Sequence, residues 1–440
     1  MKHFLIGILA VTATLMAKAV PEISGVTAAQ NPLTGQVEIV YDLAGEDAIV
    51  TLDDILLDGN SIGPSNVTAA VGHVARKVSS GNGRVIYWNP RKDIPGRELI
   101  GTLTAKLTAW PTDNPPNYLM VRLDTFAVSN NVFWYSSAAN LPDGGLTNPV
   151  YRLSRYVMSR IPAKNVVWRM GISSVTDRNV AGDENQFERG APHYVKLTAD
   201  YYMGIYPVTY GHHRAITGSV PRNSPSGSDE TPLSALNYAA LRGSGTTWPA
   251  GGHALASGAI LQTYRNAMGV EVDLPTDAQW EFAARAGASQ LFGVNGGTNS
   301  AGTKDAPLIW CSGTAPTNSY PQPPGLLKPN AWGVYDMNGN VWEWCLDQYG
   351  GTWNSGTDNW YANAWNQATE TYNGVTVYVD PVGMLLNTGA NTDKERVLRG
   401  GSVENGSNNA ISSYRHKRMY DADVNSNWSG FRLVCPVPAR

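Results

Sequence analysis

The sequence has few cysteines and few charges, and each shortage excludes a class of protein. Three cysteines among 440 residues allow at most one disulfide, which excludes a disulfide-rich scaffold. Charged residues make up only 16% of the chain and the formal net charge is −3, which argues against a nucleic-acid-binding protein with a basic surface. Beyond residue 16 no segment is long and apolar enough to form a transmembrane helix.

Patterns typical of metal and phosphate sites are also scarce. The 7 histidines include no His-x-x-x-His pair and no His/Cys pair at zinc spacing. We find no glycine-rich phosphate loop between a strand and a helix. The Gly-x-Ser-x-Gly pattern at residues 59–63 is followed by Pro64 and a polar turn, so we interpret it as a hairpin or loop and not as a nucleophile elbow.

The chain is rich in apolar residues that can form a hydrophobic core and in residues that favour turns. Hydrophobic residues account for 42% of it, while 45 glycines and 27 prolines indicate many turns. The 14 tryptophans and 21 tyrosines outnumber the 7 phenylalanines, so much of the aromatic surface carries a hydrogen-bonding group. We therefore expect a large, folded, loop-rich protein.

The first residues have the pattern of a secretory signal peptide. A basic start, Met1-Lys2-His3, precedes an apolar stretch at 4–16 that is too short to span a bilayer. Ala17-Lys18-Ala19 then matches a small-x-small cleavage site, and no cysteine for a lipid anchor lies near it. We predict a signal peptide at 1–19, cleavage after Ala19, and a secreted or periplasmic protein with no transmembrane segment.

The rest of the chain divides into two regions by pattern. Residues 20–125 contain short β-rich runs, several of them alternating apolar with polar residues, which predicts a small immunoglobulin-like β-sandwich. The runs lie at 36–41, 48–52, 85–88, 103–110 and 117–122. Residues 126–152 are rich in Asn, Ser, Pro and Gly and are predicted to form a linker. Residues 153–437 mix short strands and helices with long polar loops.

Two helices are predicted in the second region. The spacing of apolar residues over 233–242 fits one helical face. A second helix begins after Thr276, which forms a capping box with Gln279, and its left-handed stop is expected at Gly287.

The segment 335–345 concentrates oxygen donors in a turn between aromatic residues. The carboxylates of Asp336 and Glu343 and the carbonyls of Gly339 and Val341 could converge on one hard cation, and calcium takes about six to eight such oxygens. The spacing does not fit an EF-hand loop. The alternative is a polar turn whose side chains cap their own backbone.

The three cysteines lie far apart in apolar surroundings. Cys311, Cys345 and Cys435 are expected to be buried, inert thiols or to include one disulfide, and the sequence does not choose a pair.

Five segments of the second region carry a family resemblance. The two most specific are 274–287 (LPTDAQWEFAARAG) and 329–344 (PNAWGVYDMNGNVWEW). The others are 168–171 (WRMG), 202–209 (YMGIYPVT), and 396–402 (RVLRGGS) together with 430–432 (GFR). In this order they resemble the formylglycine-generating enzyme family, also called the sulfatase-modifying factor family. The resemblance implies an α+β fold, a variant of the C-type lectin architecture with little regular secondary structure.

The resemblance also implies calcium binding through Asp336, Gly339, Val341 and Glu343. A second calcium site of some members has no clear counterpart among residues 290–315.

The family's enzymes oxidise a sulfatase cysteine to formylglycine with oxygen and copper(I), which two cysteine thiolates hold after an Arg-Gly-Gly-Ser motif. Counting from Ser402 places Asn405 and Ala410 at those two positions. Copper(I) selects soft thiolates, so copper is not expected and the resemblance predicts a pseudoenzyme. Iron-dependent sulfoxide synthases of the family carry a helical bundle with histidine ligands, whereas the N-terminal region here is β-rich and has His73 as its only histidine.

Two functions of different classes follow. The preferred one is a calcium-stabilised, lectin-like binding protein for a glycan or a peptide. Its cleft would comprise Trp342, Ser402, Asn405, Ala410 and Tyr414, and further candidate contacts are Trp428 and the polar run 405–409. The alternative is an oxidoreductase that generates formylglycine from a sulfatase cysteine or performs related metal-dependent oxygen chemistry. It would need Cys345 or Cys435 to approach Ser402 as part of a pair. A purely structural cell-surface module also stays open, as do the ligand and the oligomeric state.

Overall fold

The computed structural model describes residues 19–124, 131–171, 193–221, 224–234, 236–243, 248, 252–294, 300–349, 368–382, 395–419 and 428–437. The predicted signal peptide lies outside these residues except for Ala19.

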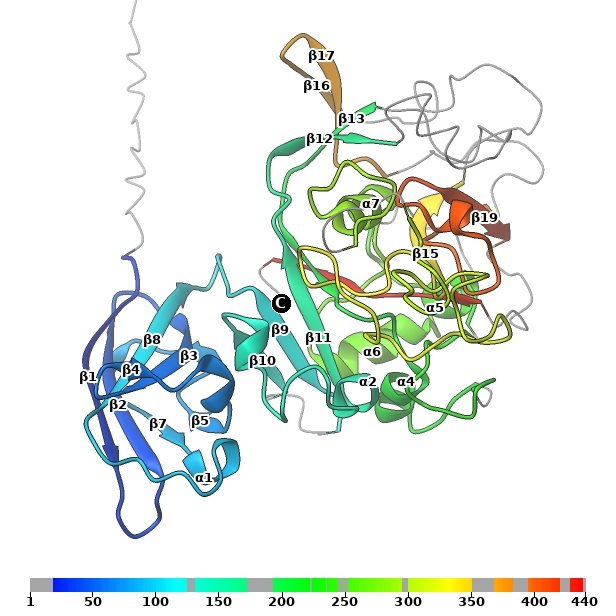
Figure 1. Cartoon of the computed structure of the whole chain (residues 1–440). Helices are drawn as coiled ribbons and strands as arrows, with labels where there is room; N and C mark the ends of the chain where they lie inside the picture. Colours follow the sequence, from blue (N-terminus) through cyan, green and yellow to red (C-terminus); the bar gives the residue numbers. More distant parts are fainter. Residues whose placement is uncertain are drawn as a thin grey trace, which may run out of the picture.

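The N-terminal part of the chain forms two antiparallel sheets (Figure 1). One has the strand order β1-β2-β7-β5, and in the other β3 pairs with β4, β6 and β8. The strands are β1 (Glu22–Gln30), β2 (Val37–Ala44), β3 (Ala48–Leu57), β4 (Asn60–Ser61), β5 (Ala70–Gly72), β6 (Arg76–Val78), β7 (Gly81–Trp88) and β8 (Leu103–Pro111), with the short helices η1 (Pro64–Asn66) and α1 (Pro90–Asp93) between them.

Both sheets contribute to one hydrophobic core. Every second residue of β2 from Val37 to Leu43 is buried, as the two-residue period of the sequence predicts. Val50 and Ile55 of β3 join the same core. Two sheets around one core agree with the predicted sandwich, while its immunoglobulin-like character and its bounds at 20–125 stay predictions.

The strand predicted at 117–122 belongs to a different sheet from the one expected. β9 (Tyr118–Arg122) pairs with β10 (Val132–Tyr135) and with β11 (Arg155–Ile161). Three consecutive residues, Leu119, Met120 and Val121, are buried, because β9 is covered on both faces and does not alternate. The predicted linker likewise holds β10, η2 (Ala138–Asn140) and α2 (Val150–Leu153).

The C-terminal part of the chain contains three further sheets with short helices around them (Figure 1). Their strand orders are β10-β9-β11-β14-β21, β12-β13-β17-β16 and β19-β18-β15-β20. The remaining strands are β12 (Val166–Met170), β13 (His193–Leu197), β14 (Tyr201–Gly204), β15 (Trp342–Gln348), β16 (Ala368–Tyr372), β17 (Val375–Val379), β18 (Glu395–Arg399), β19 (Arg415–Met419), β20 (Ser429–Gly430) and β21 (Val434–Pro436). The helices are α4 (Tyr210–Thr217), α5 (Tyr238–Arg242), α6 (Ile260–Met268), α7 (Asp277–Arg285) and η5 (Ser407–Ala410). The α+β fold class is confirmed.

The helix predictions are confirmed in part. α7 begins after Thr276 with the predicted capping box, in which Thr276 Oγ1 accepts from Gln279 N at 3.1 Å. Its left-handed stop begins one residue early, at Ala286 with φ 45°, and continues at Gly287. The helix predicted at 233–242 is shorter, because Asn237 caps α5 and helix begins only at Tyr238. No helix in the described part of the chain is long and apolar enough to cross a membrane.

Candidate functional site

The candidate site forms where β15 and the loop after β18 meet. β15 pairs with β18, and Gly400 and Gly401 follow β18 with φ of 94° and 74°. A Cβ atom at Gly401 would lie only 2.9 Å from Ala410 Cα, so glycine is needed for the loop to pack against Ala410. The close packing of these two glycines brings Ser402, Asn405 and Ala410 next to the start of β15.

Three of the predicted cleft residues are joined by hydrogen bonds. Trp342 Nε1 donates to Asn405 Oδ1 at 2.8 Å, and Ser402 Oγ donates to the same oxygen at 2.6 Å. The Asn405 carbonyl also accepts from Ser312 N at 2.8 Å. The amide of Asn405 is therefore fixed in place, with its oxygen used by the protein.

Two further rings pack against Trp342. The Tyr414 ring centroid lies 5.8 Å from that of Trp342, and the His416 centroid lies 4.9 Å away. Tyr414 is among the cleft residues predicted from the sequence, but His416, which lies two residues further along the chain and is half-buried on β19, is not. Residues two apart on a strand share a face, so the strand period could have indicated it.

Most of the predicted cleft residues have little exposed surface. Ser402 and Ala410 are fully buried, Tyr414 is 4% exposed and Trp342 is 6% exposed. Asn405 is half-buried, and the run around it, from 404 to 409, is half-buried or exposed. We call residues 404–409 the Asn405 surface. A ligand at this site would contact that surface, with the rings beneath it as support.

Trp428 lies at the edge of the same site. Its backbone oxygen accepts from Trp342 N at 2.7 Å, and its Nε1 donates to Asn318 O at 3.2 Å. The ring is half-buried and packs against a small cluster that includes Trp310 and Val403.

The predicted calcium residues lie in a strained turn beside a buried ion pair. Asp336, Gly339 and Asn340 all have positive φ. Glu343 is fully buried, and Arg432 donates to both of its oxygens at 2.6 Å, while Trp280 Nε1 donates to Oε2 at 2.7 Å.

These residues keep free acceptor positions that suit a cation. Within the part of the chain that the structure describes, Asp336 Oδ2 accepts one hydrogen bond, from Gly325 N at 2.8 Å, and Glu343 Oε1 accepts one, from Arg432. Burial, together with the nearby Glu343 charge, raises the pKa of Asp336 to about 6. The Glu343 charge is compensated by Arg432, whereas Asp336 has no paired cation among the described residues and lies in a turn with carbonyl oxygens, which are donors of the kind that calcium takes.

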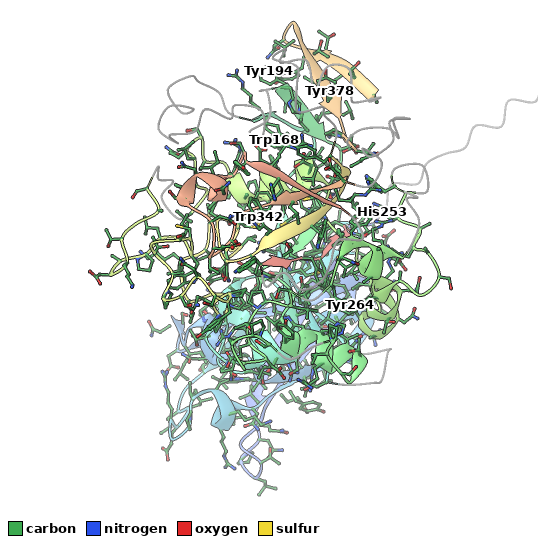
Figure 2. All side chains as sticks on the ribbon, turned by 90° about the vertical axis from the view of Figure 1, so that its right-hand side faces the viewer. Trp168, Tyr194, His253, Tyr264, Trp342 and Tyr378 are labelled. Carbon is green, nitrogen blue, oxygen red and sulfur yellow. The ribbon has the colours of Figure 1, made fainter. Side chains whose placement is uncertain are left out.

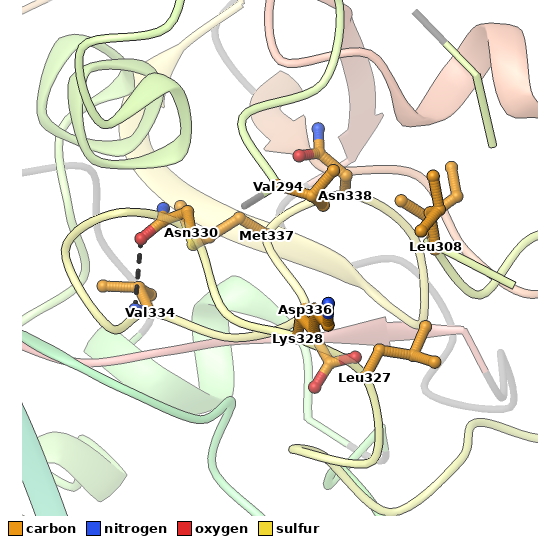
Figure 3. A pocket seen from close by; sticks show the side chains of 10 residues that line it. Val294, Leu308, Leu327, Lys328, Asn330, Val334, Asp336, Met337 and Asn338 are labelled. Carbon is orange, nitrogen blue, oxygen red and sulfur yellow. Dashed lines mark hydrogen bonds between the residues drawn. The ribbon is translucent and has the colours of Figure 1, made fainter. Parts of the chain in front are cut away.

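A small void also borders Asp336 (Figure 3). Its volume is about 10 Å³, roughly one water molecule, and Asn330, Val334 and Asn338 contribute to its lining. Of the four predicted calcium ligands it is lined by Asp336 alone. Because Gly339, Val341 and Glu343 do not line it, the void is not the predicted calcium position.

The three cysteines are free and buried. Cys345 packs in a core cluster with Ala278 and Trp280, and Cys435 Sγ lies 3.8 Å from Met158 Sδ. Burial raises the pKa of Cys311, Cys345 and Cys435, so none is a ready thiolate. Of the two alternatives predicted for them, the structure has inert thiols. Among the described residues no group of three or more His, Cys, Asp and Glu side chains is arranged to hold a metal.

Arg399 connects the site to helix α7. This fully buried guanidinium pairs with Asp277 and with Glu281 Oε2, the latter at 2.6 Å. Its Nη1 also donates to the carbonyls of Ser412 at 3.0 Å and Tyr414 at 2.9 Å. Burial acts to raise the pKa of Glu281 and Asp277, but Arg399 and the other arginines nearby lower the pKa of both carboxyl groups. The network positions both the loop after β18 and the segment that carries Tyr414.

Comparison of the chain with known proteins identifies its family. The model of the sulfatase-modifying factor enzyme 1-like domain matches residues 161–437. The formylglycine-generating enzyme of Thermomonospora curvata is 32% identical over 142 residues, which cover 29% of this chain and 37% of that protein. The enzyme of the same name from Streptomyces coelicolor is 33% identical over 142 residues, covering 29% and 35%. The chain thus matches about a third of the length of these relatives.

Among solved structures, PvdO from Pseudomonas aeruginosa is similar at 17% identity with a TM-score of 0.43, covering 64% of this chain and 94% of that one.

Proposed function

The chain belongs to the sulfatase-modifying factor enzyme 1-like family through residues 161–437, and we propose that it is an exported, non-catalytic member that binds a glycan or a peptide at the Asn405 surface. The observation that carries the proposal is the amide at position 405. Its oxygen accepts from Trp342 and Ser402, whereas an enzyme of this family would need a thiolate there for copper(I).

The chemistry of the surface supports binding. The NH₂ group of Asn405 has no partner among the described residues, and the neighbouring Ser407, Asn408 and Asn409 are half-buried. Amides and hydroxyls above buried aromatic rings supply hydrogen bonds to a ligand whose apolar face lies near the rings. We therefore expect polysaccharide or peptide arrays to retain the protein at millimolar calcium, and Asn405→Ala to weaken that binding. Silence across broad arrays would count against the proposal.

Copper(I) uptake separates this function from the oxidoreductase alternative. The purified protein is expected to take up no tight equivalent of copper(I) and to leave a Cys-x-Pro-x-Arg peptide unconverted under air. The variant with both Asn405→Cys and Ala410→Cys is expected to gain about one tight equivalent, because two thiolates would then follow the Arg-Gly-Gly-Ser motif.

The opposite results have clear meanings. One tight equivalent in the unaltered protein, or an aldehyde product from the peptide, would show that the protein is an oxidoreductase. That outcome would require Cys345 or Cys435 to leave the buried positions described above. Failure of the double variant to bind copper would show that counting from Ser402 misplaces the two ligand positions.

We also propose that one calcium ion stabilises the domain through Asp336, Glu343 and the carbonyls of Gly339 and Val341. The proposal is supported by the raised pKa of Asp336 and by the free acceptor positions on both carboxylates. A bound cation would stabilise the ionised form of Asp336, which burial disfavours, and would join the turn to β15. Chelation of the ion should therefore destabilise the folded domain.

Export is the remaining part of the proposal. The pattern at residues 1–19 supports cleavage after Ala19, so the mature protein is expected to begin at Val20. Mass spectrometry of the protein recovered outside the cytoplasm checks this, and an intact Met1 on that material would contradict it.

A further inference from the structure

A large cavity lies apart from the Asn405 surface. Its volume is about 440 Å³, within the roughly 300–1,000 Å³ that ligand pockets occupy. The loop after β13, the start of α7, Asp380–Val382 and the end of β21 all contribute to its walls. None of its lining residues belongs to the Asn405 surface, and Figure 2 shows His253, one of the lining residues, well separated from Trp342. We call this cavity the His253 pocket.

His253 is held in one orientation by a buried acid. Its Nδ1 lies 2.8 Å from Asp273 Oδ2, and the Asp273 side chain is only 3% exposed. Arg242 Nη1 pairs with the same Asp273 oxygen at 2.6 Å, which holds the carboxylate in place. In the neutral imidazole whose Nδ1 donates to Asp273, Nε2 is the acceptor, and the His253 side chain is 60% exposed.

An aromatic wall adjoins this imidazole. The Trp248 ring lies 5.2 Å from the His253 ring, and Trp248 Nε1 donates to Val382 O at 3.1 Å. Because its N–H is satisfied and Val434 and Pro436 also line the cavity, this side offers an apolar surface. Such a surface suits the C–H face of a flat, otherwise polar ligand.

The charges of the pocket are largely neutralised from within the protein. The paired carboxylates are Asp200 with Arg160 at 2.7 Å, Asp273 with Arg242 at 2.6 Å and Glu271 with Arg265 at 3.4 Å. Asp380 accepts from Thr198 N at 2.8 Å and from the Thr198 hydroxyl. Carboxylates paired in this way attract a cation or repel an anion only weakly, yet they keep lone pairs that accept hydrogen bonds from hydroxyl groups.

We propose that the His253 pocket binds a neutral saccharide, one or two sugar units in size. The carboxylates and His253 Nε2 accept hydrogen bonds from the sugar hydroxyls, and the Trp248 wall packs against the C–H face of the ring. This pocket and the Asn405 surface share no residue, so the proposal stands independently of what binds at the Asn405 surface.

The test uses the full mature protein and three kinds of probe. Binding of neutral disaccharides (maltose, cellobiose and N,N′-diacetylchitobiose) is measured by saturation-transfer NMR and calorimetry, with spermidine as a cation and a glucuronate-containing disaccharide as an anion. At least one neutral disaccharide is expected to bind, and neither charged probe should compete with it. His253→Ala is expected to weaken that binding about tenfold through loss of one hydrogen-bond acceptor.

Matched variants keep the result interpretable. Ala199→Trp, at an exposed position on the pocket wall, is expected to block binding without disturbing a core residue. His73→Ala, at an exposed histidine between β5 and β6, should bind the sugar as the unaltered protein does. Absence of binding for every neutral disaccharide would overturn the proposal. So would sugar binding that survives both pocket variants, or displacement of the sugar by spermidine.

Discussion

Arg399→Ala is expected to lower the free energy of unfolding of the C-terminal part of the chain by about 3–5 kcal/mol. The guanidinium is fully buried, pairs with Asp277 and Glu281, and donates to two backbone carbonyls. It also lies 5.4 Å from the centre of the Trp280 ring. Its removal leaves two buried carboxylates with fewer positive partners, which costs more than the loss of a surface ion pair.

Arg214→Ala is the matched control for this prediction. Arg214 makes a similar pair with Asp229, at 2.7 Å, but its side chain is 46% exposed. Solvent and salt screen a pair exposed in this way, so the control variant should unfold at nearly the same urea concentration as the unaltered protein. An Arg399→Ala variant as stable as the Arg214→Ala variant would show that the buried network does not hold the loop after β18 on α7.

Gly339→Ala is expected to destabilise the domain by about 3 kcal/mol and to abolish its response to calcium. Gly339 has φ of 89°, and a Cβ atom there would lie 2.2 Å from the carbonyl oxygen of Trp310. Its N–H also donates to Gly400 O at 2.6 Å, so a shift of this turn is transmitted to the loop after β18. Calcium added to chelated, unaltered protein should raise the midpoint of thermal unfolding, and the variant should show no such rise.

The Gly374→Ala variant distinguishes the effect of backbone strain from that of the steric clash expected in Gly339→Ala. Gly374 has φ of 78°, close to that of Gly339, but no atom lies within 4 Å of a Cβ built there. Its alanine variant therefore carries the cost of a left-handed conformation alone, about 1–2 kcal/mol, and should keep the full response to calcium. If calcium stabilises Gly339→Ala as much as it stabilises the unaltered protein, or stabilises neither, the calcium proposal is wrong.

Local features of the fold were predictable from sequence because their causes are local. The capping box of α7 involves Thr276 and Gln279, three residues apart, and the structure has it as predicted. The alternation of apolar and polar residues along β2 likewise predicts one buried face, which the structure has. The family segments identified residues 153–437 as a sulfatase-modifying factor domain, and the family model matches 161–437.

The predictions from sequence are wrong where contacts between residues distant in sequence determine the local structure. The pattern at 117–122 predicts a strand of the N-terminal sandwich. In the structure this strand pairs with β11, which begins only at Arg155. The apolar spacing of 233–242 favoured a long helix, whereas the first part of that segment packs as loop, with Leu233 N donating to Val208 O at 2.8 Å. Tertiary contacts of this kind outweigh helix propensities, which are a few tenths of a kcal/mol per residue.

The sequence by itself determined the family, the fold class and the chemical identity of the groups at positions 405 and 410. Those follow from motifs and residue types, which need no coordinates. Only the tertiary structure decided how exposed these groups are, that Asn405 Oδ1 is shared between Ser402 and Trp342, and that His253, Trp248 and Asp273 border one cavity. The reason is physical: hydrogen bonds and cavities depend on distances of a few ångströms between segments that chain connectivity leaves tens or hundreds of residues apart.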